Sequence, residues 1–231
     1  MVKKKHAGRP RVVYLSSTER GRHLLDHLRN LDCDIVFADT ESKRYKDFKD
    51  FPPYDLGISY MYTWRIPSSE FDVPYRWVNV HPGPLPEFRG RNLGWNAINS
   101  GAKTFGATIH YMDADFDTGE VIEVDRFPID SYDTAGDIVE RAHIACEGLI
   151  KKWAPRLFMG KVPSTPQTVG SYYKKTKIDN EILLNEEQKR MIRAVTVHPK
   201  FHASVTIGGR KYSIIPDEPS VNMENKLGKN T

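Results

Sequence analysis

A predicted β-strand that ends in a run of prolines constrains this chain more than any other feature. The segment is Val78-Asn79-Val80-His81-Pro82-Gly83-Pro84-Leu85-Pro86. Because side chains two residues apart share one face of a strand, Asn79 and His81 are expected to point the same way. The prolines and the glycine prevent the strand from continuing. A carboxamide and an imidazole are therefore held together where a strand leaves its sheet, which is where open α/β folds bind ligands.

The order of apolar stretches and turns predicts an α/β fold with a mostly parallel sheet. A strand over residues 11–15, a helix through about Asn30 and a strand over 33–38 form a β-α-β unit, which is typical of parallel sheets. No G-x-G-x-x-G motif follows the first strand, so the sequence carries no dinucleotide fingerprint there. Further strands are predicted over residues 56–62, 77–80, 107–112 and 121–127, and helices over 94–100 and from Thr134 to about Phe158.

Charge and turn signals divide the chain into four parts. These are a basic arm over residues 1–10, a main domain over 11–160, a C-terminal extension over 161–216 and a polar tail over 217–231. The extension is predicted to hold a short helix near residues 186–194 and a β-hairpin, because Gly208-Gly209 separates two strand-like stretches.

Composition argues against several classes of protein. The net charge of +4 arises from basic residues near the N-terminus, so the remaining chain is close to neutral and nucleic acid is not an expected partner. Cys33 and Cys146 lie far apart in apolar segments, which indicates buried thiols and no zinc site. No stretch approaches the ~20 apolar residues of a membrane helix, and the N-terminus lacks the apolar stretch of a signal peptide. We expect a cytoplasmic protein with no membrane partner and no metal.

A second turn, Asp113-Ala114-Asp115-Phe116-Asp117-Thr118-Gly119, adds carboxylates to the candidate site. Two predicted strands surround it, so it forms the end of a hairpin. Together with residues 78–90, it resembles the Asn, His and Asp constellation of the formyltransferases that use N10-formyltetrahydrofolate. The resemblance spans roughly residues 11–160, and Asn79, His81 and Asp117 match that family's catalytic residues position by position.

The resemblance implies a Rossmann-like sheet, the formyltransferase fold, and N10-formyltetrahydrofolate as the formyl donor. In the family, the backbones of two turns hold the pterin ring of the donor. The implied donor-binding residues are Trp64, Arg65, Ile66, Pro67, Asp113, Asp115 and Phe116.

Formyl transfer to an amine explains why the three side chains are needed. Asn79 can donate an N–H to the developing oxyanion, a role worth ~3 kcal/mol per donor. His81 can donate to the same oxygen or carry a proton, because an imidazole titrates near pH 7. Asp117 can accept the amine's proton or orient His81. His110 is flanked by apolar residues and is interpreted as a structural histidine.

The segment after Gly160 bears on which amine is formylated. It resembles the tail of formyltransferases that act on nucleotide-linked amino sugars, and its adjacent tyrosines and lysines suit a base and a pyrophosphate. We expect a sugar N-formyltransferase that acts on a dTDP-linked amino deoxysugar, and a homodimer built through this segment. The alternatives are a glycinamide ribonucleotide formyltransferase and a non-catalytic folate or nucleotide binder. The expected acceptor-binding residues are Arg89, Asn92, Tyr172, Tyr173 and Lys174.

Overall fold

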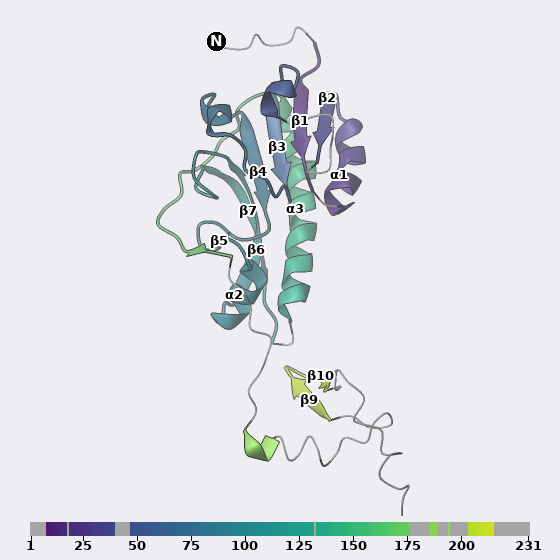
Figure 1. Ribbon diagram of the computed structural model, residues 1–231, viewed down its shortest axis with the longest axis vertical. Helices are drawn as coiled ribbons and strands as arrows, with labels where there is room; N and C mark the ends of the chain where they lie inside the picture. The colour runs from purple at the N-terminus through teal and green to yellow at the C-terminus, as the bar shows by residue number, and fades with distance from the viewer. Residues whose placement is uncertain are drawn as a thin grey trace, which may run out of the picture. The chain divides into compact units, whose positions relative to one another are not determined.

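The computed structural model describes residues 8–17, 19–39, 47–131, 133–175, 185–188, 194 and 203–214 (Figure 1). The chain divides into two compact units. The first comprises residues 1–129 and 134–176, and the second comprises 130–133 and 177–231. The predicted polar tail and most of the predicted basic arm lie outside the described residues.

A six-stranded sheet in the order β2-β1-β3-β4-β6-β7 forms the framework of the first unit. The first four strands of the chain pair in parallel, whereas β6 runs antiparallel to both β4 and β7. The predicted mostly parallel α/β sheet is confirmed, and so is the hairpin around the acidic turn. The strands are β1 (Arg11–Leu15), β2 (Asp34–Ala38), β3 (Leu56–Tyr60), β4 (Trp77–His81), β6 (Thr104–Tyr111) and β7 (Val121–Pro128).

Two helices cover one face of this sheet. In Figure 1, α1 (Glu19–Arg29) and α3 (Ala135–Phe158) lie on the same side of the strands, and α3 packs on β4, β6 and β7. Val80, Ile109 and Leu149 belong to the large buried cluster between the sheet and these helices. Apolar residues at every second strand position therefore face the helices, as the period of a strand requires.

The opposite face of the sheet carries an apolar cluster and, at the end of β4, two polar side chains. Along β4, Val78 and Val80 point toward the helices, so Trp77, Asn79 and His81 point to the other side. Trp77 packs there in a second, smaller buried cluster. The two polar side chains at the end of β4 are consequently separated from the main core by the sheet itself.

Shorter helices surround the sheet. The turns η1 (Phe48–Asp50) and η2 (Ser68–Phe71) flank β3, and α2 (Leu93–Asn99) packs against α3 through a third buried cluster. The predicted helix over residues 94–100 is thus confirmed within one residue at each end.

A segment beyond α3 returns to the sheet, and we call residues 161–175 the strap. Thr165 exchanges two backbone hydrogen bonds with Val121, both 2.8 Å long, and β8 (Tyr172–Tyr173) pairs in parallel with β5 (Arg89–Gly90). The sequence predicts residues 161–175 to be part of the C-terminal extension, but they belong to the first unit. Their pairings are too short to leave a periodic pattern in the sequence.

The second unit contains the predicted hairpin. β9 (Ser204–Ile207) pairs antiparallel with β10 (Arg210–Ser213), and the glycines between them have φ angles of 57° and 84°. Residues 186–188 and 194 are helical, and the rest of the helix predicted near 186–194 lies outside the described residues. Within the described ranges, no helix is both long and apolar enough to cross a lipid bilayer.

Candidate active site

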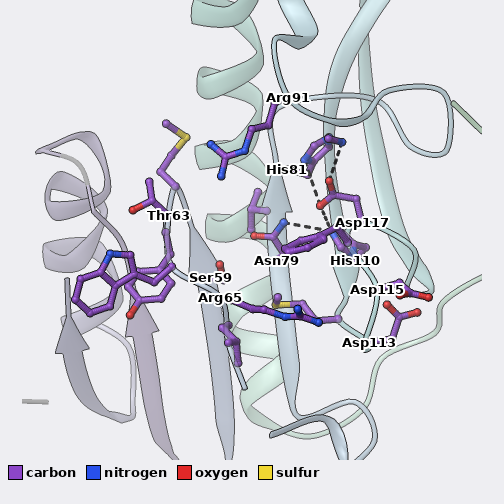
Figure 2. Close-up of a pocket in the computed structure, with 18 of the residues that line it drawn as sticks. Ser59, Thr63, Arg65, Asn79, His81, Arg91, His110, Asp113, Asp115 and Asp117 are labelled. Atoms are coloured by element: carbon purple, nitrogen blue, oxygen red, sulfur yellow. Dashed lines mark hydrogen bonds and ion pairs between the residues drawn. The ribbon is translucent and has the colours of Figure 1, made fainter. Parts of the chain in front are cut away.

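A pocket of about 460 Å³ opens on the polar face of the sheet, beside the ends of β3 and β4 (Figure 2). Strand residues Ser59, Asn79, His81 and His110 line it, and Asp117 reaches it from the turn between β6 and β7. The structure therefore brings the three predicted catalytic residues into one cavity.

The pairing of β4 with β6 explains why these side chains meet. Asn79 lies opposite His110, and His81 lies opposite Thr108 in the antiparallel ladder. Residues directly opposed in such a ladder hold their side chains on the same face, about 5 Å apart. Thr108 also fastens the proline loop, residues 82–86: its hydroxyl accepts a backbone N–H at 3.0 Å and donates to a carbonyl at 2.8 Å.

A backbone carbonyl fixes the ring of His81, which is 5% exposed. Its Nε2 lies 2.7 Å from the carbonyl oxygen of Phe88. A carbonyl oxygen only accepts, so Nε2 carries the hydrogen of this bond. The other ring nitrogen, Nδ1, faces Oδ1 of Asp117 at 3.6 Å. In the neutral ring Nδ1 holds a lone pair, and a proton taken up there lies beside a carboxylate.

His110 is buried and both of its ring nitrogens are bonded, as expected of a structural histidine, and its side chain also lines the pocket. Its Nδ1 donates to the carbonyl of Tyr111 at 2.7 Å, and burial lowers its pKa to about 4. The ring is therefore neutral near pH 7, and its Nε2 accepts from Nδ2 of Asn79 at 3.3 Å. Among the described residues no other group bonds this amide nitrogen, so the second N–H of Asn79 is available to a ligand.

Asp117 adopts a left-handed backbone conformation, with φ at 59°. For residues other than glycine this conformation costs about 1–3 kcal/mol, although Asp tolerates it better than most. Its Oδ2 accepts the backbone N–H of Gly90 at 2.9 Å, and its own carbonyl accepts the side-chain N–H of Gln167 at 2.9 Å. Neither Gly90 nor Gln167 was expected at the site, and no sequence pattern marks Gln167.

The two turns predicted to hold the donor both line the pocket, although Pro67 is not among the lining residues. The side chains of Trp64 and Phe116 are 55% and 58% exposed, which is high for large apolar groups. The guanidinium of Arg65 lies 5.7 Å from the centre of the Phe116 ring and links the two turns. The lining residues from these turns are Trp64, Arg65, Ile66, Asp113, Ala114, Asp115, Phe116 and Asp117.

Arg89 does not reach the pocket. Its Nε and Nη2 donate to Oε1 of Gln167 at 3.1 and 2.8 Å, and Nη2 also donates to the carbonyl of Thr168 at 3.1 Å. The expected contact between Arg89 and a substrate anion is therefore replaced by a clamp that holds the strap.

Of the other residues expected to bind the acceptor, Tyr172 lines the pocket and the rest do not. Asn92 precedes α2 as its N-cap residue, in a left-handed conformation. Tyr173 stacks on Phe88, with ring centres 5.6 Å apart, and Lys174 is not a lining residue. No three His, Cys, Asp or Glu side chains within the described ranges gather as a metal site requires.

Arg91 lines the pocket and was not expected there. Its backbone N–H donates to the carbonyl of Tyr173 at 2.8 Å, and its guanidinium extends into the pocket (Figure 2). No ion pair or hydrogen bond occupies this guanidinium in the part of the chain that the structure describes. The sequence signal for Arg91 was the glycine between the two arginines of Arg89-Gly90-Arg91. Gly90 has a φ of 97°, and a glycine at this position can turn the two arginines in different directions.

The fold and the pocket define an α/β protein with a polar ligand site at the ends of its sheet strands, and comparison with known proteins identifies its family. Residues 63–151, which include the three predicted catalytic residues, match the family model described as formyl transferase. A GDP-perosamine N-formyltransferase from Brucella melitensis biotype 1 is 30% identical over 217 residues, which are 90% of this chain and 80% of that protein. The chain belongs to the formyltransferase family.

Of two further relatives, one is matched by this chain over part of its length and the other shares its fold. A methionyl-tRNA formyltransferase from Janthinobacterium sp. (strain Marseille) is 30% identical over 153 residues, so this chain spans about half of that protein, 48%. The formyltransferase PseJ from Anoxybacillus kamchatkensis, solved with UDP-4,6-dideoxy-4-formamido-L-AltNAc and tetrahydrofolate, superposes with a TM-score of 0.59. It is 23% identical, and the match covers 82% of this chain and 93% of PseJ, which shows a common fold.

Proposed function

We propose that this protein transfers the formyl group of N10-formyltetrahydrofolate to the amine of a nucleotide-linked amino sugar. The observation that carries the proposal is the pocket itself. It places a free carboxamide N–H, an imidazole lone pair and a carboxylate together, beside two exposed turns that can hold a flat donor. Formylation of an amine needs an oxyanion donor and a proton carrier, and the pocket supplies both.

Asn79 stabilises the oxygen of the formyl group in this mechanism. One N–H of its amide is held by His110, and the second donates to the oxyanion that develops when the amine attacks. A neutral His110 suits this role, because a lone pair on its Nε2 fixes the amide with nitrogen toward the pocket.

His81 and Asp117 handle the proton. As the new bond between the amine nitrogen and the formyl carbon forms, the bond between that carbon and N10 of the folate breaks. The amine must lose a proton and N10 must gain one. Nδ1 of His81 can carry that proton, since the other ring nitrogen is committed to a backbone carbonyl and Asp117 lies 3.6 Å away to balance the charge.

The donor would lie against the two turns that include Trp64 and Phe116. Their exposed rings, and the guanidinium of Arg65 between them, offer a surface on which an aromatic ring system can stack. Their backbones supply the polar partners that a pterin edge requires.

The acceptor would enter beside Arg91 and Tyr172. Among the described residues the guanidinium of Arg91 has no partner, and the ring of Tyr172, which lines the same pocket, is 52% exposed. This pair suits an anion joined to an aromatic base, as in a nucleoside diphosphate. The match to a GDP-perosamine N-formyltransferase, over 90% of this chain and 80% of that protein, supports a sugar acceptor.

Two finer points belong to the proposal. We propose a dTDP-linked deoxysugar as the acceptor. Because the Brucella relative is a GDP-perosamine N-formyltransferase and PseJ was solved with a UDP-linked sugar, GDP- and UDP-linked sugars should be compared with it. We also propose that the protein forms a homodimer through its C-terminal segment, which sedimentation of the purified protein measures directly.

The deciding experiment supplies N10-formyltetrahydrofolate with one amine at a time. The amines are dTDP-, UDP- and GDP-linked amino sugars, glycinamide ribonucleotide and an initiator methionyl-tRNA. Mass spectrometry should find a formyl group added to an amino sugar nucleotide. Formylation of glycinamide ribonucleotide alone would support the alternative enzyme, and binding of folate without any turnover would indicate a non-catalytic binder.

A further inference from the structure

The side-chain amide of Gln167 in the strap has all four of its hydrogen-bonding positions filled. Its Nε2 donates to the carbonyl of Asp117 at 2.9 Å and to that of Gly119 at 2.8 Å. Its Oε1 accepts from Nε and Nη2 of Arg89 at 3.1 and 2.8 Å. An amide has two donor hydrogens and two acceptor lone pairs, so no capacity is left over.

This amide links the two segments that fix the position of Asp117. One is the turn at residues 117–119, where Gln167 bonds the carbonyl of Asp117 itself. The other is the Arg89–Gly90 strand, whose Gly90 N–H donates to Oδ2 of Asp117 at 2.9 Å. Gln167 thus holds the backbone of Asp117 directly. It also holds Arg89, and the next residue, Gly90, holds the carboxylate of Asp117.

The conformation of Asp117 makes such support necessary. Its φ of 59° lies in a region that is strained for residues with a side chain, and strain of this kind persists only where the surroundings hold it. Gln167 bonds the carbonyl groups on both sides of Thr118, which keeps the turn from relaxing. The carboxylate then stays 3.6 Å from Nδ1 of His81.

The strap itself does not depend on this amide. Backbone bonds between Thr165 and Val121, and the pairing of β5 with β8, attach the strap on both sides of Gln167. Loss of the side-chain amide should therefore leave the strap in place and loosen the turn alone.

We infer that Gln167 is a positioning residue for the reaction, acting through Asp117. The inference rests on the proposed formyl transfer. It assigns Gln167 a task that its position does not suggest, since this residue is not among those that line the pocket.

Two variants test the hydrogen bonds that the Gln167 amide donates to the turn and accepts from Arg89. Gln167→Glu keeps an acceptor for Arg89 but loses both N–H groups, and Gln167→Met keeps the length but removes every polar atom. Both should lower kcat at least tenfold, while KM for donor and acceptor changes less than threefold. Ser164→Ala is the matched control, because Ser164 bonds Glu120 from the same strap at 2.5 Å without contacting Asp117. It should leave kcat unchanged.

A double-mutant cycle tests whether Gln167 acts through Asp117. In an Asp117→Asn background, Gln167→Met should reduce kcat less than twofold, because the group that it positions is already inactive. An equal reduction in both backgrounds would show a general structural effect and would overturn the inference.

A readout independent of activity separates this inference from the proposed function. The Gly90 amide hydrogen is bonded to the carboxylate of Asp117. Its exchange with solvent, followed by NMR, should be at least tenfold faster in Gln167→Met and Gln167→Glu than in Ser164→Ala. Unchanged exchange in both Gln167 variants would refute the positioning role, even if the wild type formylates a sugar. Faster exchange would support it even if every amine in the panel failed.

Discussion

Oδ1 of Asp117 lies 3.6 Å from Nδ1 of His81, and the other ring nitrogen, Nε2, bonds a backbone carbonyl. The two residues come from different elements: His81 ends β4, and Asp117 stands in the turn between β6 and β7. The carbonyl of Phe88 and the N–H of Gly90, both beyond the proline loop, hold the two side chains at this separation. One short segment, residues 88–90, thus orients both members of the pair.

Removal of either member should stop turnover without unfolding the protein. We expect His81→Asn and Asp117→Asn each to lower kcat by at least ~100-fold, since proton-transfer groups contribute about 10²–10⁴. Asn tolerates a left-handed backbone, and its Oδ1 can still accept the N–H of Gly90, so Asp117→Asn should keep its fold. His23→Asn, at an exposed position on α1, serves as the control. Near-native turnover in either site variant would contradict the assigned roles.

Much of this arrangement could be predicted because it depends on local periodicity. Asn79 and His81 share a face of β4 because strand side chains alternate, and the prolines end that strand. The contact between His110 and Asn79 could not be predicted, because it depends on the antiparallel pairing of β6 with β4. That pairing joins segments about thirty residues apart and leaves no local pattern.

The arginines show a different limit. A strand period of two puts Arg89 and Arg91 on the same face, but the left-handed Gly90 between them breaks that relation. Arg89 bonds Gln167, nearly eighty residues further along the chain, while Arg91 enters the pocket. Tertiary contacts of this kind follow from the folded chain and not from spacing.

The donor should bind across the two turns linked by Arg65 and Phe116. A crystal structure with a folate should show pterin hydrogen bonds to the backbone of residues 64–67 and 113–117, with the reacting nitrogen near His81. Phe116→Ala should raise KM for the donor about fivefold, since an exposed cation–π contact and ring stacking are together worth about 1 kcal/mol. A folate found more than ~10 Å from His81, far beyond the contact distance of reacting groups, would contradict this placement.

Arg91 should govern the affinity for the acceptor. Because hydrogen bonds to charged groups contribute about 1.5–3 kcal/mol, Arg91→Gln should raise KM for the sugar nucleotide about 10- to 100-fold and leave KM for the donor unchanged. Arg91→Lys should retain part of the affinity, as it keeps the charge but not the planar fork. Arg126→Gln is the control, because Arg126 pairs with Glu87 and lines no part of the pocket. Equal effects of Arg91→Gln on both substrates would argue against a contact with the acceptor anion.

Acid should destabilise the protein through its buried histidines. Burial lowers the pKa of His110 from its ordinary 6.5 to about 4, and burial also lowers the pKa of His143. Between pH 6.5 and about 4, His110 binds a proton in the unfolded chain but stays neutral in the folded protein. The stability is fully present above pH 6.5 and is lost as the pH falls, by about 1.4 kcal/mol per pH unit for this one group.

Denaturant titrations at several pH values measure this dependence. The free energy of unfolding of the wild type should fall steadily from pH 6.5 toward pH 4, and the slope should be smaller by about 1.4 kcal/mol per pH unit in His110→Phe. His23→Asn, at an exposed position on α1, is the control variant for the loss of one histidine. A His110→Phe variant with the same slope as the wild type would show that folding does not lower the pKa of His110, and would contradict the neutral ring assigned to it at mildly acidic pH.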